Sequence, residues 1–294
     1  KEVARLYATS EKSIIFWGMG VSQHVHGTDN ARCLIALALT TGQIGRNGTG
    51  LHPLRGQNNV QGASDAGLIP MVFPDYQSVE NKDIHSKYEN FWKVELDNKK
   101  GLTVVEIVHK ILEDEIKSMY IMGENPAMSD PDQNHAREAL AKLDHLVVQD
   151  IFMTETAWHA DVILPSSAHA EKTGTFTNTN RQVQLGRQAV PPPGDARQDW
   201  WITQAIAQRM GLDWSYLHPR DVFNEMAQVM PSLKNITYER LENENSVTYP
   251  CDDPNKPGNE IIFNENFPTA NGRGKIVPAR LIPPAELPDD DFPM

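Results

Sequence analysis

The protein has 294 residues, of which 39% are hydrophobic and 22% charged, and this balance fits a globular protein with one large or two ordinary domains. No apolar run approaches the ~18 residues that a membrane helix needs. The formal net charge of −12 argues against a nucleic-acid partner, because phosphate binding requires a basic face. An anionic substrate must therefore be captured by a local positive site.

Short β-type runs alternate with helical patterns, which predicts right-handed crossovers and a mostly parallel sheet. The sequence "LTVVEIVHKILEDEI" places apolar side chains on one helical face, among them Val104, Val105 and Ile111. The predicted elements are a strand at 13–18, a helix at about 29–41, a strand at 118–122, a helix at about 133–143, a strand at 145–150, a short helix at about 154–159, a strand at 161–165 and a helix at about 199–210 that ends at Gly211.

From Ser246 onward the sequence is rich in Pro, Asn, Asp and Gly, which predicts irregular surface structure and a terminal linker. The two cysteines, Cys33 and Cys251, do not form a CxxC pair, so the chain itself supplies no iron–sulfur or structural zinc motif. A reducing, cytoplasmic setting is the simplest expectation. The sequence begins at Lys1 without a signal-peptide pattern, and we expect a processed chain or an internal piece of a longer one.

Polar residues and glycines follow every predicted strand, at the carboxyl ends where open α/β sheets bind their ligands. Such groups suit a polar ligand with ring edges and a phosphate. The sequence contains neither the glycine fingerprint of an ordinary dinucleotide site nor a P-loop. The strand-end residues are Met19, Gln23, His24 and His26, then Gly123, Glu124 and Asn125, then Gln149, Asp150 and Thr154, and finally Ser166, Glu171, Lys172 and Asn178.

These residues also have purely structural interpretations. Asp150 could cap a helix, residues 123–126 could form only a turn, and Lys172 could be a solvated surface charge. Arg55, which stands alone among amides and glycines in "LRGQNNVQGASDAG", could be a structural ion-pair partner. The repetition of polar groups at successive strand ends favours the functional interpretation.

The motifs together resemble a known family. "GMGVSQHVHGTDNARCLIALALTTGQIGRNGTGLHPLRGQNNVQGASD", "YIMGENP", "VVQDIFMTETAWHADVILP" and "EKTGTFTNTNRQVQ" are similar to the catalytic (alpha) subunit of molybdopterin-dependent formate dehydrogenases. These enzymes belong to the bis-(molybdopterin guanine dinucleotide), or bis-MGD, oxidoreductases, which include dimethyl sulfoxide reductases. The arginine in "RGQNNVQGASD" points to the formate dehydrogenase branch. The implied fold is α/β, with Rossmann-like parallel-sheet domains and part of a small mixed domain.

The resemblance implies a role for each matching residue. Arg55 would orient formate, because its guanidinium fits a carboxylate through two hydrogen bonds. Met19 and Gln23 would contact the pterin. The remaining implied cofactor-binding residues, most of them near the guanine dinucleotide arms, are Gln57, Gly123, Glu124, Asn125, Gln149, Asp150, Lys172 and Asp199. The implied reaction is reversible two-electron oxidation of formate to carbon dioxide at molybdenum or tungsten. The sequence leaves open the choice of metal and the choice between hydride transfer and proton abstraction.

The resemblance also implies parts that this sequence does not contain. The family's cysteine motif for a 4Fe-4S cluster, its Cys or selenocysteine metal ligand and its C-terminal cap domain have no counterpart here, so we expect no metal ligand in this chain and no activity of this segment alone. The implied domains are 1–57, the end of one Rossmann-like domain; 58–168 and 198–215, a second, MGD-binding one; and 169–197 and 216–294, part of the small domain and a linker.

The implied partners are the remainder of the catalytic subunit and electron-transfer subunits of the iron–sulfur and NAD or flavin type. Two alternatives remain at this stage. One is another bis-MGD oxidoreductase with a different substrate, against which the arginine of "RGQNN" argues. The other is a non-catalytic scaffold like the large iron–sulfur subunit of respiratory complex I, in which the polar strand-end residues should have been lost.

Overall fold

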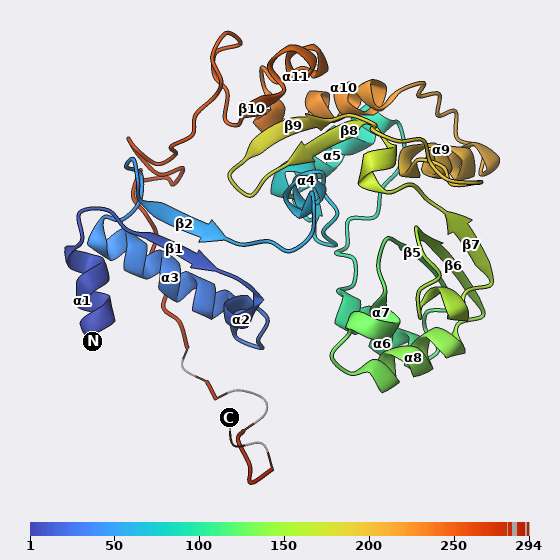
Figure 1. The fold of residues 1–294 in the computed structure, drawn as a ribbon, viewed down its shortest axis with the longest axis horizontal. Helices are drawn as coiled ribbons and strands as arrows, with labels where there is room; N and C mark the ends of the chain where they lie inside the picture. The colour runs from blue at the N-terminus through green and yellow to red at the C-terminus, as the bar shows by residue number, and fades with distance from the viewer. Residues whose placement is uncertain (281, 284–286, 292, 294) are drawn as a thin grey trace. The chain divides into compact units, whose positions relative to one another are not determined.

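The structure is a computed structural model that describes residues 1–280, 282–283, 287–291 and 293. The chain divides into two compact units (Figure 1). The first unit comprises Lys1–Gln61, Thr177–Gln182 and Thr248–Met294, and the second comprises Gly62–Phe176 and Val183–Val247. The three-part domain division expected from the sequence stays a prediction.

The first unit is built on a strand–helix–strand segment. Its strands β1 (Ile14–Trp17) and β2 (Gly50–Pro53) pair in parallel, with Ile14 opposite Gly50. Between them run the short helix α2 (Met19–Ser22) and the long helix α3 (Gly27–Thr41). Helix α3 ends at Gly42, whose left-handed backbone (φ 68°) suits glycine. Helix α1 (Glu2–Thr9) precedes β1.

The buried side chain of Gln43 links the segment after α3 to the segment between α1 and β1. Its side-chain oxygen accepts a hydrogen bond from the Ser13 backbone nitrogen at 3.0 Å. Its amide nitrogen donates to the Ser10 carbonyl oxygen at 2.7 Å. Because its amide is nearly inaccessible to solvent, these bonds offset the cost of burying it. They hold the end of α3 against the entry to β1.

A three-stranded parallel sheet forms one part of the second unit. Its order is β5 (Ser118–Met122), β6 (His145–Asp150) and β7 (Val162–Pro165). Helices α6, α7 and α8 gather beside the sheet (Figure 1). The buried core between sheet and helices consists of Ile121, Ala127, Leu140, Leu146, Val148 and Ala157. The helices are α6 (Val104–Leu112), α7 (Pro126–Ser129) and α8 (Gln133–Lys142).

The remaining elements include a small mixed region. A three-stranded sheet has the order β10-β9-β8, and β3 pairs with β4 in antiparallel orientation. The strands are β3 (Val72–Phe73), β4 (Gln77–Ser78), β8 (Gly174–Thr177), β9 (Gln182–Gly186) and β10 (Ser246–Thr248). The helices are α4 (Val60–Asp65), α5 (Lys82–Trp92), α9 (Asp199–Arg209), α10 (Pro219–Val229) and α11 (Tyr238–Glu244), with 3-10 turns η1 (Pro74–Tyr76), η2 (Ala157–His159), η3 (His169–Glu171) and η4 (Pro231–Leu233).

The strands and the longer helices predicted from residue 13 to residue 211 are confirmed, with shifts of one or two residues at their ends, whereas the short helix expected at about 154–159 is only a 3-10 turn at 157–159. The apolar face expected on α6 is buried only in part: Ile111 is 2% exposed, but Val104 and Val105 are 56% and 62% exposed. The irregular structure expected from Ser246 onward is wrong for its first residues, because Ser246–Thr248 pair as strand β10 with β9; from residue 249 onward the described residues form no helix or strand. Parts of the predicted linker, residues 281, 284–286, 292 and 294, lie outside the described residues.

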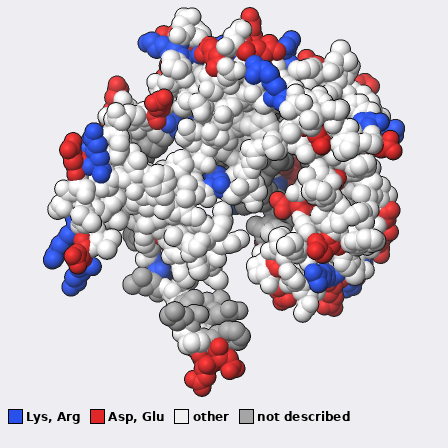
Figure 2. All heavy atoms as spheres, in the orientation of Figure 1, with Lys and Arg blue, Asp and Glu red and all other residues white. Residues whose placement is uncertain are grey.

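On the face shown in Figure 2, Lys and Arg side chains lie singly or in small groups among Asp and Glu. Within the described part of the chain, none of the helices combines the length and the apolar character that crossing a bilayer requires.

The core of the parallel sheet gives the first testable prediction. Leu146 on β6 is 1% exposed, so Leu146→Ala leaves a cavity and should lower the free energy of unfolding by about 2–5 kcal/mol. The matched control is Val162→Ala on neighbouring β7, where the side chain is 40% exposed and the loss should stay below about 1 kcal/mol. Denaturant unfolding followed by circular dichroism measures both. Equal losses would contradict this placement of the core.

Candidate functional site

The carboxyl ends of β5, β6 and β7 meet at one edge of the second unit's sheet. Met122 lies opposite Gln149, and Asp150 lies opposite Pro165. The Gly123 backbone nitrogen donates a hydrogen bond to the Gln149 carbonyl oxygen at 2.9 Å, which turns the chain away just beyond β5. The residues predicted at successive strand ends are thereby brought to a single edge.

A line of hydrogen-bonded side chains runs across this edge. Gln149 is completely buried; its oxygen accepts from the Tyr120 hydroxyl, and its nitrogen donates to Asp199 Oδ1 at 2.8 Å. Lys172 Nζ forms an ion pair with Asp199 Oδ2 and also donates to the Ser167 carbonyl oxygen. Burial, and secondarily the charge of Asp199, raises the pKa of Tyr120, so its hydroxyl stays protonated and able to donate.

One buried hydroxyl at this edge has no partner. Ser167 is 3% exposed, and its side-chain oxygen forms no hydrogen bond with the residues that the structure describes. The carbonyl of the same residue accepts from Lys172. A hydroxyl and an ammonium group close together form a donor pair that suits a phosphate or a similar acceptor.

Asn125 joins the loops that follow β5 and β6. Its side-chain oxygen accepts from the Thr156 backbone nitrogen at 3.1 Å and from the Thr156 hydroxyl at 2.8 Å. Its amide nitrogen donates to Glu155 at 2.7 Å, and this bond is the main reason that the pKa of Glu155 lies below its usual range. Buried Thr156 in turn accepts from the Ala127 nitrogen. Asn125 is therefore engaged structurally in this unit.

The other predicted residues of the second unit keep their polar groups accessible. Gly123 is exposed with φ 67°, and no atom lies within 4 Å of where a Cβ would stand. Glu124 is exposed as well. Asp150 Oδ1 accepts from the Ile151 backbone nitrogen at 2.6 Å, a local bond at the strand end rather than a helix cap.

Met19, Gln23, Arg55 and Gln57 belong to the first unit. Met19 begins α2 and is 49% exposed, and the Gln23 backbone nitrogen caps that helix by donating to the Met19 carbonyl oxygen. Arg55 follows β2, where the Leu54 nitrogen donates to the Trp17 carbonyl oxygen at 2.7 Å. The Arg55 side chain is exposed and forms no hydrogen bond or ion pair among the described residues.

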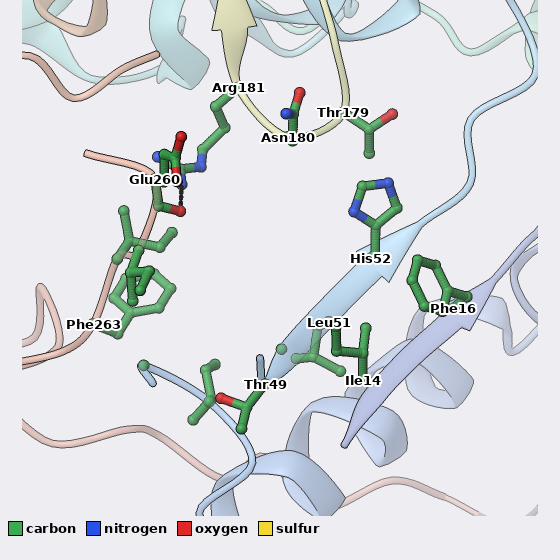
Figure 3. A pocket seen from close by; sticks show the side chains of 15 residues that line it. Ile14, Phe16, Thr49, Leu51, His52, Thr179, Asn180, Arg181, Glu260 and Phe263 are labelled. Atoms are coloured by element: carbon green, nitrogen blue, oxygen red, sulfur yellow. Dashed lines mark hydrogen bonds between the residues drawn. The ribbon is translucent and has the colours of Figure 1, made fainter. Parts of the chain in front are cut away.

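A separate pocket of about 310 Å³ lies in the first unit (Figure 3). Phe16 and His52 from the strands face one another there, with ring centroids 5.4 Å apart. On the opposite side, the Arg181 guanidinium donates to the carbonyl oxygens of Tyr249, Asn259 and Glu260. Arg181 thus uses its donors to hold the chain around residues 249–260. None of the predicted site residues lines this pocket.

The sequence of residues 3–209 matches the molybdopterin oxidoreductase family. The chain belongs to the molybdopterin oxidoreductases. It is 49% identical over 294 residues to the F420-dependent formate dehydrogenase subunit alpha of Methanocaldococcus jannaschii and 44% identical over 296 residues to the F420-dependent formate dehydrogenase 2 subunit alpha of Methanococcus maripaludis. These alignments cover 99% and 100% of this chain but 43% of each relative, so the chain spans less than half of their length.

A solved structure shares the fold of this molybdopterin oxidoreductase. Acetylene hydratase from Pelobacter acetylenicus superimposes with a TM-score of 0.57 at 18% identity, over 84% of this chain and 36% of that one. The expected α/β class with parallel sheets is confirmed by the structure and by the family. Among the described residues no group of three or more His, Cys, Asp or Glu side chains could hold a metal ion.

The residues at the edge of the second unit's sheet fit the family's cofactor type. A molybdopterin carries phosphate and hydrogen-bonding ring edges. The unpartnered Ser167 hydroxyl and Lys172 would donate to the phosphate. The Asp199 carboxylate would accept from a ring edge. Sequence reasoning missed Tyr120 and Ser167. Tyr120 is two residues before the end of β5, so the alternation of strand side chains could have placed it beside Gln149.

The dual engagement of Asn125 gives the second prediction. Asn125→Ala removes the acceptor of the buried Thr156 hydroxyl and should lower the free energy of unfolding by about 1–3 kcal/mol without any cofactor. The pKa of Glu155 should move back up toward its ordinary range, since its main hydrogen bond is lost. Denaturant unfolding and carboxylate titration by NMR measure the two effects.

The control is the neighbouring exposed residue. Glu124→Ala should change the free energy of unfolding by less than about 0.5 kcal/mol. If Asn125→Ala lowered the free energy of unfolding no more than Glu124→Ala does, the hydrogen bonds of Asn125 would not be what holds the loops after β5 and β6 together.

Proposed function

We propose that this chain is part of the alpha subunit of a formate dehydrogenase, which converts formate to carbon dioxide with release of one proton and two electrons. The observation that carries the proposal is the 49% identity, over nearly the whole chain, to a formate dehydrogenase alpha subunit. The experiment that tests it is formate oxidation by the complete purified enzyme.

Arg55 is the residue proposed to bind formate. The chain has a net charge of −12, so attraction of a small anion depends on a local cation. The Arg55 guanidinium is exposed and its donors are unused among the described residues. A guanidinium holds a carboxylate through two parallel hydrogen bonds, which fixes the direction of the C–H bond of formate as well as its position.

The cofactor proposed for this chain is bis-MGD with molybdenum or tungsten, which supplies the two-electron redox centre when bound. In the second unit Lys172 and the Ser167 hydroxyl would donate to phosphate, and Asp199 and Asp150 would accept from a guanine edge. Gly123 leaves the edge open because it has no side chain. In the first unit Met19, Gln23 and Gln57 are proposed to contact the pterin.

The remaining partners are proposals too. The names of the relatives point to coenzyme F420 as electron acceptor. The sequence alone favoured iron–sulfur and NAD or flavin-type electron-transfer subunits, and a 4Fe-4S cluster outside this chain. Assaying formate oxidation with F420, NAD and an artificial viologen acceptor separates these possibilities. A cytoplasmic location also stays a prediction.

The third prediction concerns Arg55. Arg55→Lys keeps the positive charge but replaces the planar pair of donors by a single ammonium group, so KM for formate should rise about tenfold or more. The assay is steady-state formate oxidation with a viologen acceptor. The control is Arg32→Lys, since Arg32 is an exposed arginine of the same unit paired with Asp29, and its KM should not change. An unchanged KM in Arg55→Lys would contradict the role given to Arg55, and absence of formate oxidation by the complete unaltered enzyme would favour another bis-MGD oxidoreductase with a different substrate.

The fourth prediction concerns retention of the cofactor. Lys172→Met leaves Asp199 without its cation and removes a donor from the edge, so the metal retained per chain should fall severalfold. Plasma mass spectrometry for molybdenum and tungsten on the complete enzyme is the measurement. The control is Lys110→Met, which breaks exposed ion pairs with Glu113 and Glu115 and should leave the metal content unchanged.

The metal measurement also decides between enzyme and scaffold. About one molybdenum or tungsten per chain in the unaltered protein is the expected result. No metal in the complete, correctly assembled protein would contradict the proposed redox function and favour the complex I-like scaffold. A full metal content in Lys172→Met would instead contradict only the role given to Lys172.

A further inference from the structure

The second unit contains a cavity that the candidate site does not use. Its volume is about 580 Å³, and α9 contributes to its wall. Four aromatic, three aliphatic and two polar residues line it: Trp92, Trp200, Trp214, Tyr216, Val94, Leu212, Val222, Thr203 and Glu225. Half of the six tryptophans of the chain therefore lie around a single cavity.

The aromatic wall is held in place before any ligand binds. The Trp92 ring packs against Tyr88 with centroids 4.9 Å apart. Buried Gln204 on α9 brackets Tyr216, since its oxygen accepts from the Tyr216 nitrogen at 2.6 Å and its nitrogen donates to the Tyr216 carbonyl oxygen at 3.0 Å. Gln208, one turn further, donates to the Trp214 carbonyl oxygen at 2.6 Å. A ligand would find these rings already positioned.

The charge at the cavity is negative. Glu225 is the only charged residue among those lining it, and the described residues give Glu225 no cationic partner. One of its oxygens accepts from the Tyr216 hydroxyl. Burial and this carboxylate raise the pKa of Tyr216 to about 12, so the phenol stays a neutral donor. The other carboxylate oxygen remains available.

Other polar groups of the wall are already used. The Thr203 hydroxyl donates to the Asp199 carbonyl oxygen at 2.9 Å, and the Trp200 indole nitrogen donates to the Gln198 side chain at 2.8 Å. Lys93 lies between Trp92 and Val94 in the sequence but does not line the cavity. The lining thus combines four aromatic and three aliphatic side chains with one carboxylate that has no cationic partner among the described residues.

We propose that this cavity binds an organic cation that carries a quaternary or tertiary ammonium group on an apolar body. Ring faces of Trp and Tyr attract a cation through their quadrupole, and Trp is the strongest of the aromatic residues in this role. The Glu225 carboxylate adds attraction of the same sign. The volume of the cavity exceeds that of an ammonium group alone, so the apolar body has room among the remaining rings.

The test compares two probes of the same shape. Isothermal titration of the purified protein with para-hydroxyphenyltrimethylammonium should show saturable binding. Its neutral isostere, para-tert-butylphenol, has a carbon atom in place of the positively charged nitrogen. We expect this neutral probe to bind at least about tenfold more weakly. Equal affinities would overturn the proposal and leave a merely apolar cavity. Absence of binding by the cation up to millimolar concentration would overturn it as well.

Variants locate the site. Glu225→Gln keeps an oxygen to accept from Tyr216 but removes the charge, so affinity for the cationic probe should fall about tenfold while affinity for the neutral probe stays the same. Trp214→Leu should lower the affinity for the cationic probe by a similar factor. The control is Trp201→Leu on the same helix, since Trp201 is 46% exposed and does not line the cavity.

A second measurement shows whether a variant loses binding only because it is misfolded. Circular dichroism spectra and thermal melting of Glu225→Gln should match those of the unaltered protein, because the hydrogen bond to Tyr216 is preserved. Undiminished binding of the cation by Glu225→Gln, or an equal loss in Trp201→Leu, would overturn the proposed site. Formate oxidation is not part of the readout, so failure here leaves the proposed enzymatic function untouched.

Discussion

The buried amide of Gln149 is the constraint on which the arrangement of the candidate site depends. A side-chain amide without access to water must find partners for both its oxygen and its nitrogen. Gln149 finds them in Tyr120 and Asp199, which are distant from it in sequence. The end of β6 is thereby tied to the neighbouring strand and to the first residue of α9, and Asp199 in turn holds Lys172. A negative charge in the first turn of α9 also interacts favourably with the helix dipole.

The strands that could be predicted are those whose sequence carries the signal by itself. β5, β6 and β7 are short runs rich in apolar side chains between polar segments. The rule that parallel strands end at one edge predicted that Gln149 and Lys172 lie near each other, and in the structure Asp199 binds both. β2, with the sequence "GLHP", was missed because its Gly and Pro carry no strand propensity, and its pairing with β1 decides its conformation. Ser167 and Tyr120 escaped detection because their importance comes from burial and hydrogen bonding, which appear only in the fold.

Two arginines of the first unit show why residue type alone does not define a site. Arg181 is bound to several backbone carbonyl oxygens, and burial lowers its pKa, so its guanidinium serves to hold the chain around residues 249–260. Arg55 is exposed, follows directly on a strand end, and has its donors unused among the described residues. From the sequence, a structural ion pair was an open alternative for Arg55. The described residues supply no such ion pair for Arg55, whereas Arg181 is engaged in structural bonds.

Helix α9 connects the candidate site with the aromatic cavity of the same unit. Its first residue contributes the carboxylate that joins Gln149 to Lys172, and the next, Trp200, lines the cavity. Thr203, one turn later, also lines the cavity and donates to the carbonyl oxygen of Asp199. Gln204 and Gln208 also fix the cavity wall to this helix through the Tyr216 and Trp214 backbone, so residues of one helix contribute to both places.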